Sequence, residues 1–358
     1  MKKVFISDCE GPISKNDNAF EVTAHFVPNG DKLFTVISRY DDVLAYAIKR
    51  NGYKAGDTLK LILPFLKAHN VTDKKLREFS SQSLVLIQKA KEMLHYVSRL
   101  AHTFIVSTSY EHYMKALCEA VDFPLRNVYC TRLRIDKYHI TENEKKKLKE
   151  LAKEIVRMPI IEISPEAKCL EDLSAEYREA ILRLDEIFWE EMAKMESGRF
   201  LSEVNPLGGV KKAKAVQEVV VKVGAKLTDV MYVGDSITDV EAFKLVKENG
   251  GLTVSFNGNK YAVENAEVAV LANNCIATAV IAEIFSRFGK KQTLSIIEEW
   301  SLETLRRAQI SQTLIESLLD FGELPKVKII KRDDIEVLAK ESSEFRRKVR
   351  GEAIARLG

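Results

Sequence analysis

The stretch that decides the fold is VFISDCEGP, residues 4–12, in which an apolar run leads into two carboxylates and a glycine. A second stretch of the same kind, VMYVGDSITD, occupies residues 230–239. Each has the composition of a buried parallel strand that delivers acidic side chains to its carboxyl end. Ligands bind at that edge of an open α/β sheet. If the two strands converge there, four carboxylates come together: Asp8, Glu10, Asp235 and Asp239.

Such a concentration of negative charge is tolerable only around a cation, because neighbouring carboxylates repel one another. Oxygen ligands suit Mg²⁺, and a phosphate is the usual protein-bound partner of that ion. The sequence therefore predicts a Mg²⁺ site and a phosphorylated substrate. Its candidate metal ligands are Asp8, Glu10, Asp235 and Asp239.

Composition indicates an enzyme-like globular chain with no strong field for polyanions. The 358 residues are 46% hydrophobic and carry a net charge of +3, so nucleic acid is not an expected partner. The five cysteines are odd in number and form no C-x-x-C pair, which favours reduced thiols in a cytoplasm. The amino terminus is too polar for a signal peptide, and no stretch is long enough to span a membrane.

Periodicity along the chain divides it into a core with three additions. Strand patterns alternate with helix patterns in the core, whereas residues 16–83 read as helices separated by Pro and Gly breaks. A helix is predicted over residues 84–100, before a strand that ends near Ser107. The predicted division is an α/β core from residues 1–15, 84–130 and 200–289, a helical cap from 16–83, a mostly helical second insertion from 131–199, and a helical C-terminal extension from 290–358.

The order of these motifs resembles the haloacid dehalogenase superfamily of phosphohydrolases. D-C-E-G-P at residues 8–12 matches the family's D-x-D-G-T, and G-D-S-I-T-D at residues 234–239 matches its G-D-x-x-x-D. Ser107 ends an apolar strand where the family has a phosphate-binding Ser or Thr. Lys212 best fits the family's lysine by its distance from Asp235, although Lys211 and Lys214 lie close by.

The resemblance implies a fold and a set of roles. The fold is a doubly wound, three-layer Rossmann-like core with a helical cap. By resemblance Asp8 is the nucleophile, Glu10 the acid/base, Asp235 a metal ligand and Asp239 a partner of Lys212. The cap position is similar to that of the phosphoserine phosphatase branch. The second insertion and the extension resemble archaeal proteins of the superfamily, some of which carry a label as accessory subunits of energy-converting hydrogenases.

The residues themselves support this chemistry. A phosphomonoester dianion repels a carboxylate nucleophile, so attack by Asp8 requires positive charge from Mg²⁺ and Lys212 and a hydrogen bond from Ser107. Glu10 lies two residues beyond Asp8, on the same side of an extended strand, where it can transfer a proton. Glu10 is also the departure from the family's usual Asp, although enolase-phosphatases of the superfamily carry D-x-E-G-T. Pro12 replaces the usual Thr.

Several residues outside the motifs have more than one interpretation. Arg39, Tyr40, Lys49 and Arg50 of the cap are candidate contacts for an anionic substrate. The basic residues Arg346, Arg347, Lys348 and Arg350 are interpreted as favouring a helix carboxyl terminus. The leading function is a Mg²⁺-dependent phosphatase acting on a small phosphorylated metabolite. The alternative is a non-catalytic scaffold or accessory subunit, and a homodimer through the helical insertions is the expected assembly.

Overall fold

A computed structural model describes residues 2–162 and 169–355, and its centre is a seven-stranded sheet of order β3-β2-β1-β4-β5-β6-β7. The strands are β1 (Val4–Ser7), β2 (His102–Tyr110), β3 (Val128–Thr131), β4 (Val230–Gly234), β5 (Leu252–Phe256), β6 (Val268–Leu271) and β7 (Lys326–Ile329). The first six run parallel, and β7 runs antiparallel to β6.

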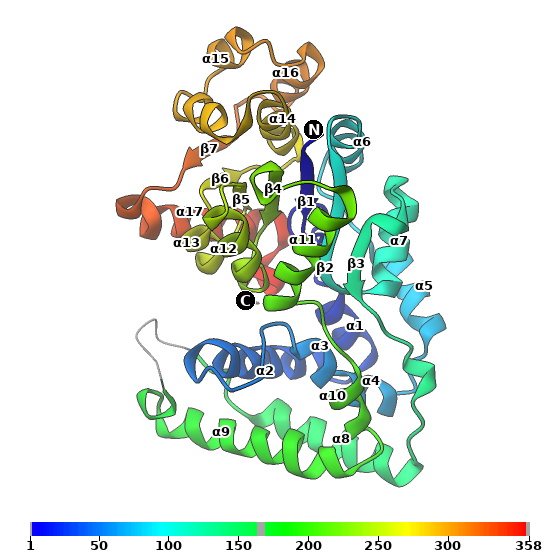
Figure 1. Ribbon diagram of the computed structural model, residues 1–358. Helices are drawn as coiled ribbons and strands as arrows, with labels where there is room; N and C mark the ends of the chain where they lie inside the picture. The colour runs from blue at the N-terminus through cyan, green and yellow to red at the C-terminus, as the bar shows by residue number, and fades with distance from the viewer. Residues whose placement is uncertain (1, 163–168, 356–358) are drawn as a thin grey trace.

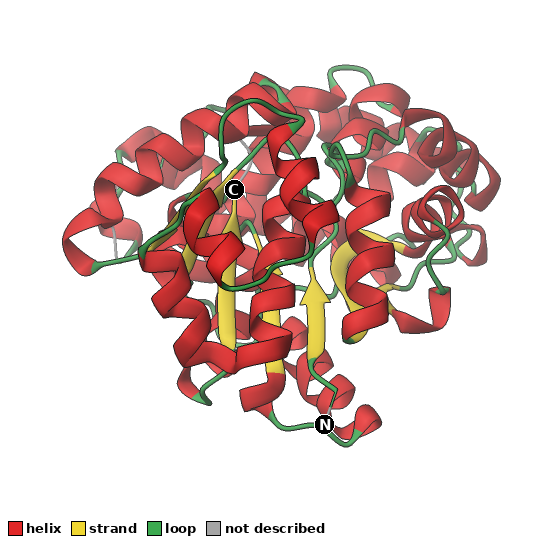
Figure 2. Ribbon diagram, turned by 90° about the horizontal axis from the view of Figure 1, so that it is seen from above, coloured by secondary structure: helices red, strands yellow, loops and turns green. Residues whose placement is uncertain are grey.

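Helices cover both faces of this sheet, which gives the doubly wound, three-layer α/β fold that the sequence predicts (Figure 2). Phe5 of β1 packs in the core of one face, whereas Val4 and Ile6 pack in the core of the other. All of β1 is buried, and for this reason it reads as a continuous apolar run. One face carries α6 (Ala90–Leu100), α7 (Glu111–Val121) and α14 (Ile276–Glu298), and the other carries α11 (Val210–Val223), α12 (Val240–Glu248) and α13 (Lys260–Asn265).

The pairing of β1 places the two acidic stretches side by side. Ser7, the last residue of β1, lies opposite Ile105 of β2 on one side and Val233 of β4 on the other. Because the three strands are parallel, the residues that follow β1 and β4 meet at one edge of the sheet.

The two insertions lie together beyond that edge of the sheet (Figure 1). They share one hydrophobic core, in which Tyr40, Phe65 and Leu151 pack with Phe188. The cap therefore rests on the second insertion as well as on the sheet. Its helices are α1 (Asn18–Phe26), α2 (Gly30–Asp42), α3 (Thr58–Leu61), α4 (Leu63–Ala68) and α5 (Asp73–Ser83), and those of the second insertion are α8 (Glu142–Arg157), α9 (Ala175–Asp185) and α10 (Gly198–Glu203).

The C-terminal extension is mainly helical, as predicted, and it also contributes a strand that the sequence analysis did not find. It contains α15 (Leu302–Arg307), α16 (Gln312–Leu319), α17 (Ile335–Arg350) and α18 (Glu352–Ala355), but between α16 and α17 it adds strand β7 to the sheet. The helix predicted over residues 84–100 was also too long, because residues 84–88 are extended, with isolated bridges from Leu86 and Gln88, and α6 begins at Ala90. Nowhere in the described residues is there a helix with both the length and the apolar character to cross a membrane.

The shared core of the two insertions predicts a large effect for one aromatic side chain. Phe188 is fully buried, and its ring centroid lies 5.8 Å from that of Tyr40 and 6.3 Å from that of Phe65. We expect Phe188→Ala to lower the free energy of unfolding by about 3–5 kcal/mol, because the deletion leaves a cavity. The matched control is Phe288→Ala, at a ring that is 42% exposed, with an expected loss under about 1 kcal/mol. Equal losses in denaturant unfolding would contradict the shared core.

Candidate active site

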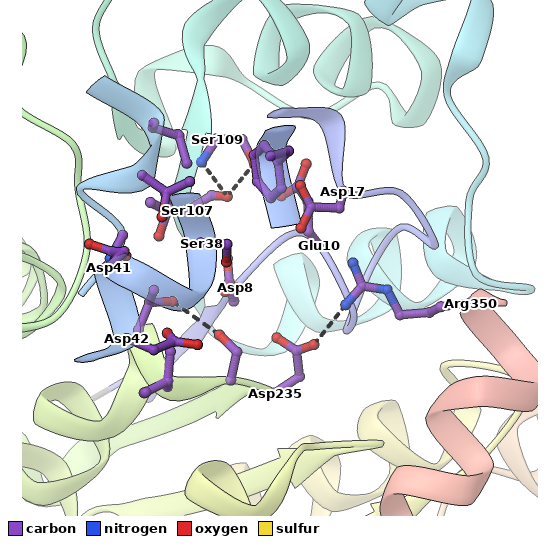
Figure 3. Close-up of a pocket in the computed structure, with 18 of the residues that line it drawn as sticks. Asp8, Glu10, Asp17, Ser38, Asp41, Asp42, Ser107, Ser109, Asp235 and Arg350 are labelled. Carbon is purple, nitrogen blue, oxygen red and sulfur yellow. Dashed lines mark hydrogen bonds and ion pairs between the residues drawn. The ribbon is translucent and has the colours of Figure 1, made fainter. Parts of the chain in front are cut away.

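A cavity of about 110 Å³ lies at the edge of the sheet where β1 and β4 end. Cap, core and C-terminal extension all contribute to its walls, as the labelled side chains of Figure 3 show. Six carboxyl side chains and two arginines are among its lining residues: Asp8, Glu10, Asp17, Asp41, Asp42, Asp235, Arg346 and Arg350. The cap closes over it, since Tyr46 donates a 2.8 Å hydrogen bond to the carbonyl of Ile237.

Asp8 follows β1 directly, and its carboxylate is held on both oxygens. Oδ1 accepts a 2.6 Å hydrogen bond from the backbone N–H of Cys9, and Oδ2 lies 2.5 Å from Nζ of Lys212. The Cys9 side chain is buried in the core on one face of the sheet, as the alternation along an extended strand requires. Asp8 is therefore fixed by its neighbours with its carboxyl at the cavity wall.

Lys212 is the lysine that the structure places at the site. It lies in the first turn of α11 and is fully buried, with Nζ 2.5 Å from Asp8 and 2.7 Å from Oδ1 of Asp239. Lys211 is only partly buried and Lys214 is exposed, so the ambiguity in the sequence is resolved by the face of the helix. Burial lowers the pKa of Lys212, but the carboxylates of Asp239 and Asp8 raise it above its ordinary value.

Asp239 lies below the cavity, and its carboxylate accepts hydrogen bonds on both oxygens. Its Oδ1 accepts hydrogen bonds from Lys212 and from the hydroxyl of Tyr232, each 2.7 Å long. Its Oδ2 accepts from the backbone N–H groups of Asp235 and Ser236, each at 3.1 Å. Both oxygens are thus already occupied, which suits a residue that orients Lys212 and the turn after β4.

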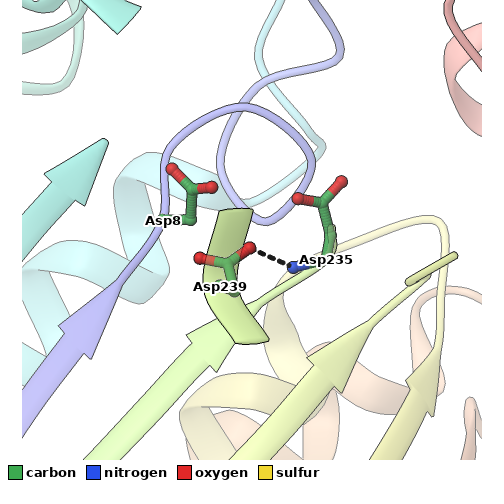
Figure 4. Close-up of side chains that lie close together, drawn as sticks. All are labelled: Asp8, Asp235 and Asp239. Atoms are coloured by element: carbon green, nitrogen blue, oxygen red, sulfur yellow. Dashed lines mark hydrogen bonds between the residues drawn. The ribbon is translucent and has the colours of Figure 1, made fainter. Parts of the chain in front are cut away.

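Asp235 follows β4 and faces Asp8 across the edge of the sheet (Figure 4). Its Oδ2 accepts hydrogen bonds from Nη1 of Arg346 and, at 3.0 Å, from Nη1 of Arg350. Gly11 passes close to the same oxygen, because a Cβ at this residue would lie 2.1 Å from it. Gly11 also has φ of +108°, so two independent constraints require glycine there.

The carboxylates of Asp8, Asp235 and Asp239 offer oxygens that lie within 4.8 Å of one another. Buried oxygen ligands at this spacing fit a divalent cation such as Mg²⁺. Asp8 and Asp235 line the cavity whereas Asp239 lies outside its lining, so Asp8 and Asp235 would be the side-chain ligands of the cation. Burial raises the pKa of Asp8 to about 7, with a further contribution from the charges of Asp239 and Asp235, whereas Lys212 lowers it.

Glu10 lines the cavity but does not join these three carboxylates. Its Oε1 accepts a 2.8 Å hydrogen bond from the backbone N–H of Asn18, the first residue of α1. Burial, and next the charge of Asp17, raise the pKa of Glu10 well above its ordinary range. A carboxyl in this environment favours the protonated form, which is the form that a general acid needs.

Ser107 lines the cavity, but it lies within β2 and not at the end of the strand, where the sequence had placed it. Its Oγ lies 3.0 Å from Oγ of Ser109 and accepts a 3.3 Å hydrogen bond from the backbone N–H of that residue. The strand continues past Ser107 to Tyr110, whose hydroxyl donates to the carbonyl of Leu59 in the cap. The hydroxyl of Ser107 is thus positioned by the strand that also contacts the cap.

The cap contributes acidic side chains to the cavity, and this differs from the prediction. The candidate contacts Arg39, Tyr40, Lys49 and Arg50 are not among the residues that line it. Tyr40 and Arg50 instead bind Asp185 of the second insertion. The cap side is lined by Asp41 and Asp42, and burial raises their pKa values to about 6 and about 7.

Arg346 and Arg350 are the site residues that sequence reasoning missed. Arg350 does lie in the last turn of a helix, as the interpretation from the sequence expected, but both arginines are also buried against Asp235. Arg347 and Lys348 are exposed on the same helix. The spacing of four residues was the available signal, since it places Arg346 and Arg350 on one face of a helix.

Comparisons with known proteins agree with this geometry. Residues 70–283 match the family model for haloacid dehalogenase-like hydrolases. A search of curated proteins found no match. Among solved structures, a gene product from Archaeoglobus fulgidus is similar over 100% of this chain and 99% of its own, with 25% sequence identity and a TM-score of 0.81. Phosphoserine phosphatase in its apo form is similar over 81% of this chain and 100% of its own, with 12% identity and a TM-score of 0.48.

The matched segment spans more than half of the chain and contains Ser107, Lys212 and Asp235. Asp8 precedes it in the sequence, but the pairing of β1 with β2 and β4 brings Asp8 to the same site. Family match, fold and site geometry lead to one conclusion: the chain belongs to the haloacid dehalogenase-like hydrolases.

Proposed function

We propose that this hydrolase is a Mg²⁺-dependent phosphatase, which cleaves a small phosphorylated metabolite through an aspartyl phosphate on Asp8. The proposal rests on the side chains that meet at the wall of the cavity. The carboxylate of Asp8 lies at the wall of the cavity beneath the cap, 2.5 Å from Lys212, with the carboxyl of Glu10 and the hydroxyl of Ser107 in the same wall. Nucleophile, positive charge, proton donor and hydrogen-bond donor are therefore available together.

In the first step an oxygen of Asp8 attacks phosphorus, and the bond from phosphorus to the leaving alcohol breaks. Glu10 supplies the proton that the alkoxide needs, so a neutral alcohol leaves. Lys212 keeps Asp8 oriented through its contact with Oδ2, and Ser107 donates a hydrogen bond to the phosphoryl group. A Mg²⁺ ion bound by Asp8 and Asp235 would offset the negative charge of the phosphate and of the nucleophile.

In the second step Glu10, now ionised, removes a proton from a water molecule. That water attacks the aspartyl phosphate, the bond between Asp8 and phosphorus breaks, and inorganic phosphate is released. Asp8 returns to a carboxylate and Glu10 to a protonated carboxyl. A volume of about 110 Å³ and the closed cap favour a small substrate and the exclusion of bulk water.

The nucleophile is tested by Asp8→Asn. We expect this substitution to abolish Mg²⁺-dependent hydrolysis of p-nitrophenyl phosphate, because an amide cannot form the acyl phosphate. Asp320→Asn, at an exposed position in the C-terminal extension, is the control and should leave turnover unchanged. Turnover by Asp8→Asn at the wild-type rate would exclude the covalent mechanism.

The acid/base role of Glu10 is tested by comparing two leaving groups. Glu10→Gln should slow hydrolysis of an alkyl phosphate by about a hundredfold or more, because the alkoxide needs a proton. Hydrolysis of p-nitrophenyl phosphate should slow much less, since p-nitrophenolate leaves without one. Glu10→Asp should retain activity, as it keeps a carboxyl group. Small and equal losses on both substrates would show that Glu10 transfers no proton.

The raised pKa of Asp8 predicts how Mg²⁺ binding depends on pH. The carboxyl is protonated below about pH 7 in the free protein, so a bound cation must displace that proton. We expect the affinity for Mg²⁺ to fall as the pH drops from 8 to 6, with uptake of a proton by the buffer at pH 6 and little at pH 8. Calorimetric titration in buffers of different ionisation enthalpy measures this uptake. If the affinity for Mg²⁺ stays constant over this pH range and no proton is released, the pKa of Asp8 lies far below 7.

A further inference from the structure

The C-terminal helix α17 is docked against the core beside the active site. Leu338 and Ala339 pack in a small hydrophobic cluster with Val263 and Leu271. The hydroxyl of Ser342 donates a 2.7 Å hydrogen bond to the carbonyl of Gly258. Nη1 of Arg346 donates a 3.3 Å hydrogen bond to the carbonyl of Asp235, so the end of α17 lies next to the loop that follows β4.

From the end of α17 two arginines reach the cavity. Arg346 is 4% exposed and Arg350 is 9% exposed, and both line the cavity. Arg350 is anchored further by Nε, 2.9 Å from the carbonyl of Lys15, and by Nη2 on the carbonyl of Asn16. Arg346 donates to Asp235 through Nη1, but its buried Nε has no hydrogen-bond partner in the described part of the chain.

The two arginines change the net charge of the ion-pair network at the cavity. The ion pairs below the cavity join three acids, Asp8, Asp235 and Asp239, to three bases, Lys212, Arg346 and Arg350, so the network is neutral. A bound Mg²⁺ would raise its charge to +2. Without the two arginines the same metal-loaded group would be neutral, because Mg²⁺ and Lys212 would only balance the three acids. Within this network the arginines supply the positive charge that balances a phosphate dianion. Burial raises the pKa of each other carboxyl that lines the cavity, which favours the neutral form and limits the negative charge that they add: Glu10, Asp17, Asp41 and Asp42.

Among the described residues of the cap, no basic side chain lines the cavity, although Arg39 forms a 3.3 Å ion pair with Asp42. The cap wall consists of acids and neutral groups, with Asp41 and Asp42 facing the core. Glu10 and Asp17 line the same cavity, and neither forms an ion pair within the described residues. A planar guanidinium with several N–H donors suits phosphate oxygens, and burial strengthens such contacts.

We propose that Arg346 and Arg350 form a phosphate-binding element of the active site, supplied by the C-terminal helix. This inference rests on the proposed phosphatase function and deepens it, since it assigns the recognition of the dianion to the extension. The exposed Arg347 and Lys348 on the opposite side of α17 take no part in it.

The test is calorimetric titration of the full chain with inorganic phosphate in the presence of Mg²⁺, and with Mg²⁺ alone. Arg346→Gln and Arg350→Gln should each raise the Kd of phosphate by about tenfold or more, because each removes a buried charge from the anion site. The Kd of Mg²⁺ should stay equal or fall, because a repelling positive charge has been removed. Arg347→Gln, on the same helix, is the matched control and should change neither constant. Arg346→Lys keeps the charge and should retain most of the phosphate affinity.

The two dissociation constants together distinguish phosphate binding by the arginines from a purely structural role of these side chains. If phosphate and Mg²⁺ binding weaken together in Arg346→Gln, the arginine only supports the fold and the inference fails. An unchanged phosphate Kd in both glutamine variants also overturns it. Wild-type protein that binds phosphate as expected but does not hydrolyse p-nitrophenyl phosphate would refute the proposed function and leave this inference standing.

Discussion

Three buried carboxylates at one edge of a parallel sheet are the constraint on which the rest of the structure depends. Removing a carboxylate from water costs several kcal/mol unless a cation or several hydrogen bonds replace the lost hydration. Lys212 meets this need for Asp8 and Asp239, and two arginines meet it for Asp235. The placement of α11 and α17 therefore follows from electrostatics as much as from apolar packing. A substitution that neutralises one partner leaves the other charge buried without compensation.

The added segments bury their apolar faces within the chain. Leu148, Leu151 and Ile155 of α8 pack in the same core as the cap helices. Their amphipathic pattern in the sequence could equally have meant an outward docking face for an accessory subunit. The structure shows that this apolar face is buried against other parts of the same chain, and that the extension carries side chains into the active site. Both facts make the added segments parts of one catalytic unit in the proposed function.

Sequence patterns were sufficient where a local rule fixes the position of a side chain. Asp8 and Asp235 could be placed together because buried parallel strands end at one edge. Lys212 could not be separated from its neighbours by spacing, since the choice depends on which helix face is buried. Strand β7 escaped detection because lysines alternate along it, as is common in edge strands that avoid pairing with other chains. Arg346 lies 111 residues from Asp235, and no local pattern reports such a tertiary contact.

The pairing of Arg350 with Asp235, next to Asp8, also bears on how the protein is made. A ribosome releases Asp8 long before Arg350, so the complete charge network cannot exist until α17 has been synthesised. Until α17 emerges, Asp235 must remain hydrated, protonated or bound to a free cation. Premature termination a dozen residues before Arg350 would leave most of the sheet intact and yet deliver an active site with the wrong charge.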